Sequence, residues 1–257
     1  MDERGKSGTS WRPLSAPLAT AGVLVLAGVL GIGRLWDDGP TAGFILLVVT
    51  VGSIEFAVIR RTFDRTWAEA GPQPVTLASW VTIGRTSAIA LLAGFLLTGL
   101  PAGELEWVPA ILFGIAAGLD AVDGPLARAA GSVSRFGERL DEIVDSVTVL
   151  VGAVVVVLLG LARPAFLAVG LAWYVFVVGI YYRRYQSNPV YELDATVSRR
   201  VLGAMVMGVI FVVLLPPVDP ATATIFTTTV AIPFLLNFLR DWLVVSGRLD
   251  RGTSRRG

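Results

Sequence analysis

Four aspartates in an otherwise apolar chain are the residues best suited to chemistry. They are Asp120, Asp123, Asp141 and Asp145, all within one short stretch of the sequence. A charged side chain at bilayer depth costs at least ~2.5 kcal/mol, so carboxylates inside membrane segments are functional-site candidates by default. Helical residues three or four positions apart share a face, so the first two aspartates and the last two form carboxylate pairs. We interpret the two pairs as the walls of one acidic pocket.

The side chains that the chain lacks narrow the chemistry of this pocket. There is no Cys and no His, which excludes thiolate and imidazole ligands, and any general base must be Asp, Glu, Tyr or a chain terminus. Clustered carboxylates repel one another in a low dielectric unless cations neutralise them. Oxygen-only ligands favour hard cations, and Mg²⁺ in proteins commonly lies between carboxylates and substrate phosphates. The cluster therefore predicts a Mg²⁺ or Mn²⁺ site that takes a phosphate-bearing substrate.

The residues between the two aspartate pairs suit a bound ligand. Gly124, Ala127 and Gly137 are small, which lets a ligand approach the backbone. Arg128 offers a planar guanidinium that matches phosphate oxygens. Gly124 is followed by Pro125, and we predict that this pair interrupts the helix at the rim of the membrane, so that the chain can return as the next span.

The composition is that of a polytopic membrane protein. Of the 257 residues, 54% are hydrophobic and 16% are charged, well under the roughly 25% charged residues of soluble domains. The mean hydropathy is +0.70. We therefore expect an all-α helix bundle, with spans long enough for a hydrocarbon core of ~30 Å. Eight apolar runs qualify, at residues 14–33, 41–59, 80–100, 108–121, 143–161, 165–182, 201–215 and 221–245.

One long polar break, at residues 60–73, separates the first two apolar runs from the others. We predict a six-helix catalytic core over residues 74–247. An N-terminal extension with two transmembrane helices, residues 1–73, precedes this core, and a basic tail, residues 248–257, follows it. The first apolar run lacks a cleavage pattern, so we expect the N-terminus to be retained.

The distribution of Lys and Arg predicts the orientation, because these residues concentrate in cytoplasmic loops. Nearly all of them fall in the terminal segments and in every second connection. The other connections hold only Arg34 and Arg163, and Arg85 and Arg240 lie within apolar runs. We expect eight spans, both termini in the cytoplasm, and the acidic pocket at the cytoplasmic face. In a prokaryote the membrane is the plasma membrane, and no nucleic-acid partner is expected.

The aspartates and the residues between them resemble a family signature. The pattern Asp-x2-Asp-Gly-x2-Ala-Arg-x8-Gly-x3-Asp-x3-Asp is that of the CDP-alcohol phosphatidyltransferases, and every specified position is matched from Asp120 to Asp145. Upstream, the stretch from Ser79 to Arg85 resembles the family's Asn-x-x-Thr-x-x-Arg, with Ser79 in place of Asn. The resemblance covers residues 74–245.

Members of this family are six-helix membrane enzymes, usually homodimers, that join a CDP-linked lipid to an alcohol and release CMP. The resemblance implies that Asp120, Asp123 and Asp141 ligate two divalent metals. It implies that Asp145 contributes to that site and acts as the catalytic base. The nucleotide-binding residues that it implies are Asp120, Asp123, Gly124, Ala127, Arg128 and Gly137, with Thr82 and Arg85 as neighbours.

Some polar residues in apolar runs also admit a purely structural explanation. The hydroxyl of Thr82 can bond within its own helix, and Arg85 can extend to the membrane interface. Arg240 and Asp241, neighbours in the last run, are expected to form an internal ion pair.

The acceptor alcohol depends on residues outside the signature. A phosphorylated acceptor needs cationic side chains, and the candidates are Arg199 and Arg200, with Arg183 and Arg184 further upstream. Anchoring at the cytoplasmic interface is the alternative for all four. Our hypothesis is transfer from CDP-diacylglycerol to glycerol 3-phosphate, as in a phosphatidylglycerophosphate synthase. Inositol phosphate or another alcohol is the alternative acceptor.

Two other classes of protein use acidic residues in membrane bundles. Prenyltransferases bind Mg²⁺-diphosphate between acidic clusters that are far apart in sequence, whereas Asp123 and Asp141 are close together. Transporters carry carboxylates on ion pathways and often show interrupted helices in corresponding halves. The sequence holds one acidic hairpin without a counterpart, which disfavours both classes.

Overall fold

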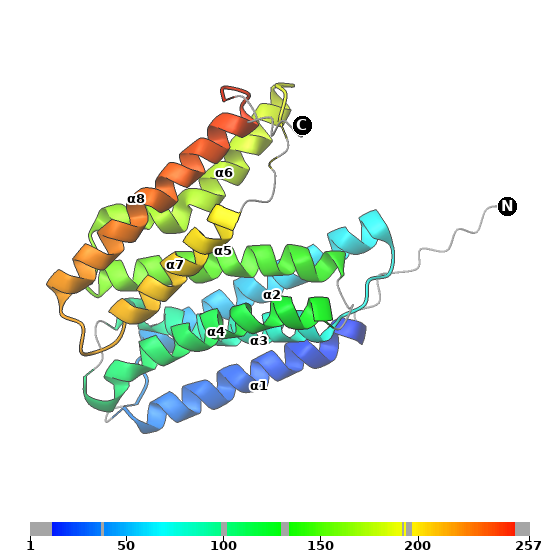
Figure 1. The fold of residues 1–257 in the computed structure, drawn as a ribbon. Helices are drawn as coiled ribbons and strands as arrows, with labels where there is room; N and C mark the ends of the chain where they lie inside the picture. Colours follow the sequence, from blue (N-terminus) through cyan, green and yellow to red (C-terminus); the bar gives the residue numbers. More distant parts are fainter. Residues whose placement is uncertain are drawn as a thin grey trace. The chain divides into compact units, whose positions relative to one another are not determined.

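The computed structural model is helical throughout the part of the chain that it describes. That part comprises residues 12–36, 39–98, 102–129, 134–191, 193 and 197–249, with only the backbone described at residues 121–129 and 197. Within these residues there are eight α-helices, three short 3-10 helices and no strand (Figure 1). The predicted all-α fold is confirmed.

Each α-helix coincides with one of the predicted apolar runs. The helices are α1 (Arg12–Arg34), α2 (Ala42–Ala70), α3 (Leu77–Gly94), α4 (Val108–Ala129), α5 (Arg135–Leu158), α6 (Leu167–Tyr185), α7 (Val197–Val213) and α8 (Pro220–Val245), with 3-10 turns η1 (Phe95–Leu97), η2 (Gly103–Trp107) and η3 (Pro164–Phe166). Five helical segments, residues 12–34, 42–70, 77–97, 164–185 and 220–245, are long and apolar enough to cross a membrane. The chain is therefore an integral membrane protein.

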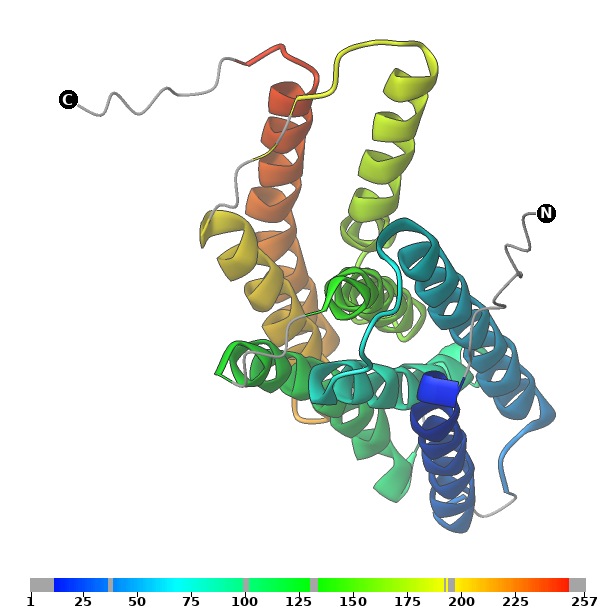
Figure 2. The same ribbon diagram turned by 90° about the vertical axis from the view of Figure 1, so that its right-hand side faces the viewer.

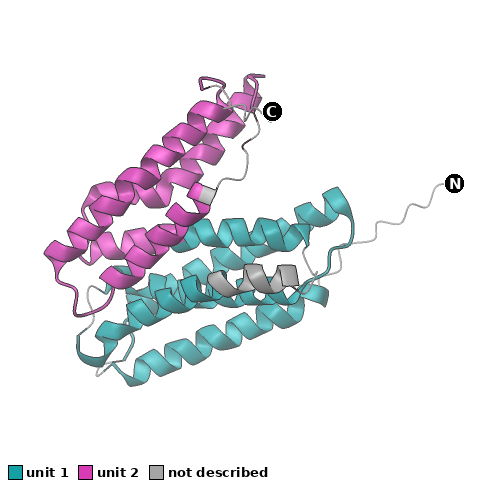
Figure 3. Ribbon diagram, viewed as in Figure 1, with its two compact units in different colours: residues 1–148 teal, residues 149–257 magenta. Residues whose placement is uncertain are grey.

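The chain forms two compact units, residues 1–148 and residues 149–257, which Figure 3 colours separately. In the first unit α3 is the central helix, because α1, α2 and α4 all pack against it. Gly94 of α3 allows α2 to approach closely, because a Cβ atom at this position would lie 2.5 Å from Cε2 of Phe44 on α2. The two helices of the predicted N-terminal extension thus share a core with α3.

The end of α2 differs from the prediction. The prediction that residues 60–73 form a break between two helices is wrong over most of this length, since α2 continues to Ala70. The reason is a buried stripe at Ile59, Thr62, Phe63 and Thr66, which follows the i, i+3, i+4, i+7 spacing of one helix face. The helix ends where Gly71 adopts a φ of 76°.

The expected interruption at Gly124-Pro125 is also wrong, because α4 runs without a break to Ala129. Proline removes one backbone hydrogen bond, but membrane helices tolerate this loss where neighbouring groups satisfy the freed carbonyl. Helix α4 ends at Ala129, and α5 begins at Arg135.

In the second unit α8 packs against both α6 and α7 (Figure 2). Gly179 on α6 allows this approach, since a Cβ atom there would lie 2.6 Å from the Trp242 ring of α8. The first turn of α8 is capped by Asp219, whose Oδ1 accepts hydrogen bonds from the backbone amides of Ala221 and Thr222, each at 3.0 Å.

The Asp219 cap makes stability depend on pH. Hydrogen bonds from Thr222 lower the pKa of Asp219 from its usual value. A carboxyl with a depressed pKa stabilises the fold above its unfolded pKa of about 4, and this contribution is lost as the pH falls through the folded value. We expect Asp219→Ala to lower the melting temperature by a few degrees at pH 7 and by less at pH 3, measured by thermal unfolding in detergent. Thr224→Ala, a nearby control at a half-buried position, should show no such pH dependence; equal effects of Asp219→Ala at both pH values would contradict the assignment.

Candidate active site

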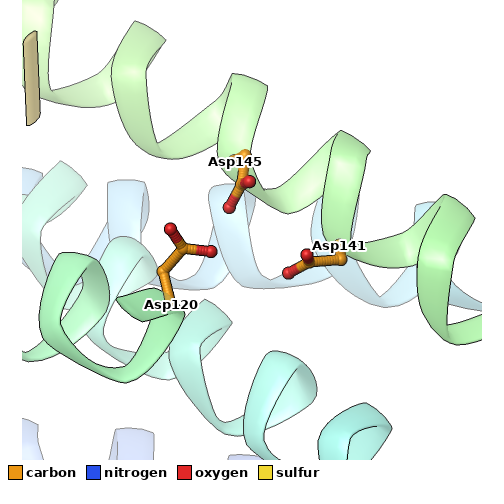
Figure 4. A group of neighbouring side chains, drawn as sticks. All are labelled: Asp120, Asp141 and Asp145. Atoms are coloured by element: carbon orange, nitrogen blue, oxygen red, sulfur yellow. The ribbon is translucent and has the colours of Figure 1, made fainter. Parts of the chain in front are cut away.

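Three of the four predicted aspartates meet in the first compact unit. Asp120 comes from α4, Asp141 and Asp145 come from α5, and Figure 4 shows their carboxylates pointing toward one another. One carboxylate oxygen of each lies within 4.8 Å of those of the other two. The three side chains are partly exposed, at 26%, 36% and 35%. The spacing of four residues on α5 puts its two aspartates on one helix face, as predicted.

Arg85 of α3 lies at the centre of this cluster, with its side chain fully buried. Its Nη1 donates to Oδ1 of Asp120 at 2.9 Å and to Oδ1 of Asp141 at 3.0 Å. Its Nη2 donates to Oδ1 of Asp145 at 2.7 Å, and its Nε donates to the backbone carbonyl of Ala116 on α4 at 2.9 Å. One guanidinium therefore connects α3 to the acidic residues of α4 and α5.

The charge balance of the cluster favours a further cation. One guanidinium does not neutralise three ionised carboxylates, so the cluster retains a negative field. Each carboxylate has two oxygens with about four lone-pair sites, so a bond to Arg85 does not exhaust it as a ligand. The donors are hard oxygens close enough together to share an ion, which fits Mg²⁺ or Mn²⁺.

Four other predicted residues lie on the same stretch of α4. Asp123 is three positions after Asp120, which places it on the same face of the helix. Gly124, Ala127 and Arg128 follow before α4 ends. The side chains of these four residues are outside the described part of the structure.

Gly137 lies in the first turn of α5, where helices α3 and α5 meet. A Cβ atom on Gly137 would lie 3.1 Å from Oγ of Ser79 and 3.2 Å from Oγ of Ser134. Ser134 caps α5, since its Oγ accepts a hydrogen bond from the Gly137 amide at 3.1 Å. The two serine hydroxyls take up the space beside Gly137, which makes this glycine a point of close helix contact.

Thr82 and Arg85, predicted as neighbours of the nucleotide, are both buried on α3. The hydroxyl of Thr82 donates to the carbonyl of Ala78 at 3.0 Å, a bond within its own helix. The guanidinium of Arg85 is buried against the aspartates. This contact was not predicted from the sequence, although a signal was present: an arginine inside an apolar run needs an anionic partner, and the aspartates of the signature were candidates.

Arg199 and Arg200, the candidates for an acceptor phosphate, lie on α7 in the second unit. Arg199 Nε donates to Oδ2 of Asp241 at 2.9 Å, and Asp241 is buried. Arg200 is exposed. The expected pair of Arg240 with Asp241 is wrong: neighbouring helical residues point about 100° apart, and Arg240 is exposed whereas Asp241 is buried.

Removing Arg85 tests its role as counter-ion. Arg85→Gln leaves three carboxylates without their buried partner, so we expect the free energy of unfolding to fall by about 3–5 kcal/mol in EDTA. Added Mg²⁺ should restore more stability to this variant than to the wild type, because it supplies the missing positive charge. Thermal unfolding in detergent with EDTA or Mg²⁺ measures both effects. Arg200→Gln is the control for an exposed arginine, and unchanged stability of Arg85→Gln in EDTA would refute the role.

Comparison with known proteins identifies the family. The family model described as CDP-alcohol phosphatidyltransferase matches residues 75–246. An archaetidylinositol phosphate synthase of Pyrococcus horikoshii is 42% identical over 74 residues, which cover 27% of this chain and 38% of that protein. The similarity thus spans less than half of this curated relative. No solved structure matches the chain. The family match includes Arg85 and all four aspartates and extends over more than half of the sequence, so the chain belongs to the CDP-alcohol phosphatidyltransferase family.

Proposed function

We propose that this protein transfers a phosphatidyl group from a CDP-linked lipid, CDP-diacylglycerol, to an alcohol acceptor and releases CMP. The observation that carries the proposal is the convergence of Asp120, Asp141 and Asp145 from two helices, with oxygens close enough to share a cation. Membership of the family supports the same reaction. The activity belongs to phospholipid biosynthesis.

The aspartates of the signature would hold two divalent metal ions, Mg²⁺ or Mn²⁺. The candidate ligands are Asp120, Asp123, Asp141 and Asp145. When bound, the ions neutralise the negative charge of the donor diphosphate. All the ligands that we propose are carboxylates, in keeping with a chain without Cys or His.

Asp145 is our candidate for the catalytic base. Its carboxylate takes the proton of the acceptor hydroxyl, whose oxygen attacks the lipid-side phosphorus of the CDP-lipid. The bond from that phosphorus to the bridging oxygen breaks, and CMP leaves with the electron pair. The 2.7 Å bond from Arg85 Nη2 to Oδ1 of Asp145 orients this carboxylate.

The nucleotide would lie along the signature. We propose Asp120 and Asp123 with Gly124, Ala127 and Arg128 on α4 as its main contacts. Gly137, Thr82 and Arg85 complete the proposed set. Arg128 suits the phosphates because its guanidinium is planar and always charged.

The acceptor is proposed to be a phosphorylated alcohol, with glycerol 3-phosphate as our first candidate. Arg199 and Arg200 are the residues that we propose for its phosphate. The name of the Pyrococcus relative, archaetidylinositol phosphate synthase, favours an inositol phosphate as the second candidate.

We propose eight spans, with both termini and the active site in the cytoplasm, and a homodimer. The alternation of Lys and Arg between connections supports this orientation. The eight described helices supply one helix for each proposed span. In a prokaryote the enzyme would lie in the plasma membrane, where the CDP-lipid diffuses in the bilayer and the soluble acceptor arrives from the cytoplasm.

An acceptor screen tests the reaction. Purified protein with Mg²⁺ or Mn²⁺ and CDP-diacylglycerol should release CMP with glycerol 3-phosphate or inositol phosphate, and the lipid product identified by mass should carry that acceptor. Release of inorganic diphosphate from a prenyl donor would indicate a prenyltransferase instead. Substrate flux in proteoliposomes without CMP release would indicate a transporter. If no acceptor yields CMP, the proposal fails.

Asp145→Asn tests the base. The amide cannot accept the hydroxyl proton, so we expect the turnover rate to fall by about 10²–10⁴-fold. Binding of the CDP moiety should largely persist, because the other aspartates and Arg85 remain. Glu142→Gln removes an exposed carboxylate of the same helix and should leave turnover nearly unchanged. Wild-type turnover of Asp145→Asn would exclude this residue as the base.

A further inference from the structure

The C-terminal end of α2, beyond Ile59, lies against the first turns of α5. Phe63 of α2 and Phe136 of α5 have ring centroids 5.2 Å apart in a T-shaped arrangement. Both side chains are fully buried. Buried aromatic pairs of this geometry contribute beyond their apolar area and restrict how each ring can turn. Phe63 therefore fixes the side of α5 that faces α2.

The rotation of α5 decides where its aspartates point. Phe136, Leu140 and Val144 are all buried and follow one another at four-residue intervals, so they form one face of the helix. Asp141 and Asp145 each come one residue after a member of this face, which is about 100° further around the helix. A rotation of α5 about its own axis that moved this buried face away from α2 would also move both carboxylates away from Arg85.

A second contact lies six residues further along α2 and three residues further along α5. Glu69, next to the end of α2, forms an ion pair with Arg139 of α5, with Oε2 and Nη2 2.6 Å apart. Both side chains are about half exposed, so this pair contributes little to stability. Arg139 comes two residues before Asp141, so this ion pair is well placed to hold the first turns of α5.

These contacts come from outside the part of the chain that matches the family. The match begins at residue 75, whereas α2 ends at Ala70. About 100° around α5 from Phe136, Gly137 lies close to Ser79 of α3, so the first turn of α5 contacts both α2 and α3.

We infer that α2 is a positioning element of the aspartate site. Phe63 and Glu69 set the rotation and axial position of α5, and through that helix they aim Asp141 and Asp145 at the position of the bound cation. Helix α2 is therefore required for full cation affinity in this protein. This inference rests on the proposed function only in taking the aspartates as ligands of a divalent metal.

The test measures binding of Mn²⁺ alone to the purified full-length protein, by electron paramagnetic resonance of the free ion. Phe63→Ala should weaken Mn²⁺ binding about tenfold, the effect of losing a group that orients metal ligands. Phe44→Ala is the matched control, because Phe44 is also fully buried on α2 but contacts the rings of Trp36 and Phe95 instead of α5. The control should lower thermal stability by a similar amount and change the Mn²⁺ affinity less than about twofold.

The ion pair allows a rescue experiment in a well-folded protein. Glu69→Arg places two like charges together and should weaken Mn²⁺ binding about two- to fivefold. The double variant Glu69→Arg with Arg139→Glu restores the attraction and should recover most of the affinity. If Phe63→Ala does not fold, Phe63→Leu together with this charge exchange decides the question.

The outcomes separate this inference from the proposed reaction. Unchanged Mn²⁺ affinity in the Phe63 variants, or an equal loss in Phe44→Ala, would overturn the positioning role even if the wild type releases CMP. A wild type that releases no CMP with any acceptor, but whose Mn²⁺ binding depends on Phe63 and on the charge pair, would leave the positioning role intact and refute the transferase proposal.

Discussion

The buried guanidinium of Arg85 is the interaction on which the arrangement of the site depends. It joins α3 to a backbone carbonyl of α4 and to three carboxylates of α4 and α5. A buried arginine is stable only when it is paired and hydrogen-bonded, and clustered carboxylates are stable only near positive charge. The guanidinium and the carboxylates therefore stabilise one another within an apolar helix bundle. The same bonds hold the aspartates close together before any metal arrives, which reduces the cost of assembling the site.

The packing of the first unit explains why an extension beyond the family match shares the core with the site. Helix α3, which carries Arg85, is covered by α1, α2 and α4. Ser87, two residues after Arg85, donates to the carbonyl of Ala21 on α1 at 3.1 Å. With Phe63 against Phe136 on α5, the first two helices contact both α3 and α5. A hydrocarbon environment gives no hydrophobic drive for helix association, so such close polar and aromatic contacts determine which helices stay together.

Local sequence patterns predicted the helices well because apolar runs of this length have no alternative structure in a bilayer. Predictions from these local patterns were wrong at two places, the end of α2 and Pro125 of α4. The end of α2 is charged, yet Phe63 and Thr66 continue its buried face, and the helix runs on to Ala70. Pro125 is a helix breaker by propensity, yet α4 continues past it. At the end of α2 the polar residues were visible in the sequence, whereas the contacts of the buried face were not.

The sequence by itself determined the family, the all-α membrane fold and the two acidic pairs, because these depend on residue types and on spacings within one helix. Only the tertiary structure decided which residues form ion pairs with one another. Arg85 meets Asp120 and Asp145 across separations of 35 and 60 residues, and Asp241 pairs with Arg199, 42 residues away, instead of its neighbour Arg240. Helical periodicity states which side of a helix a residue occupies, but only the packing of helices against one another decides what that side meets.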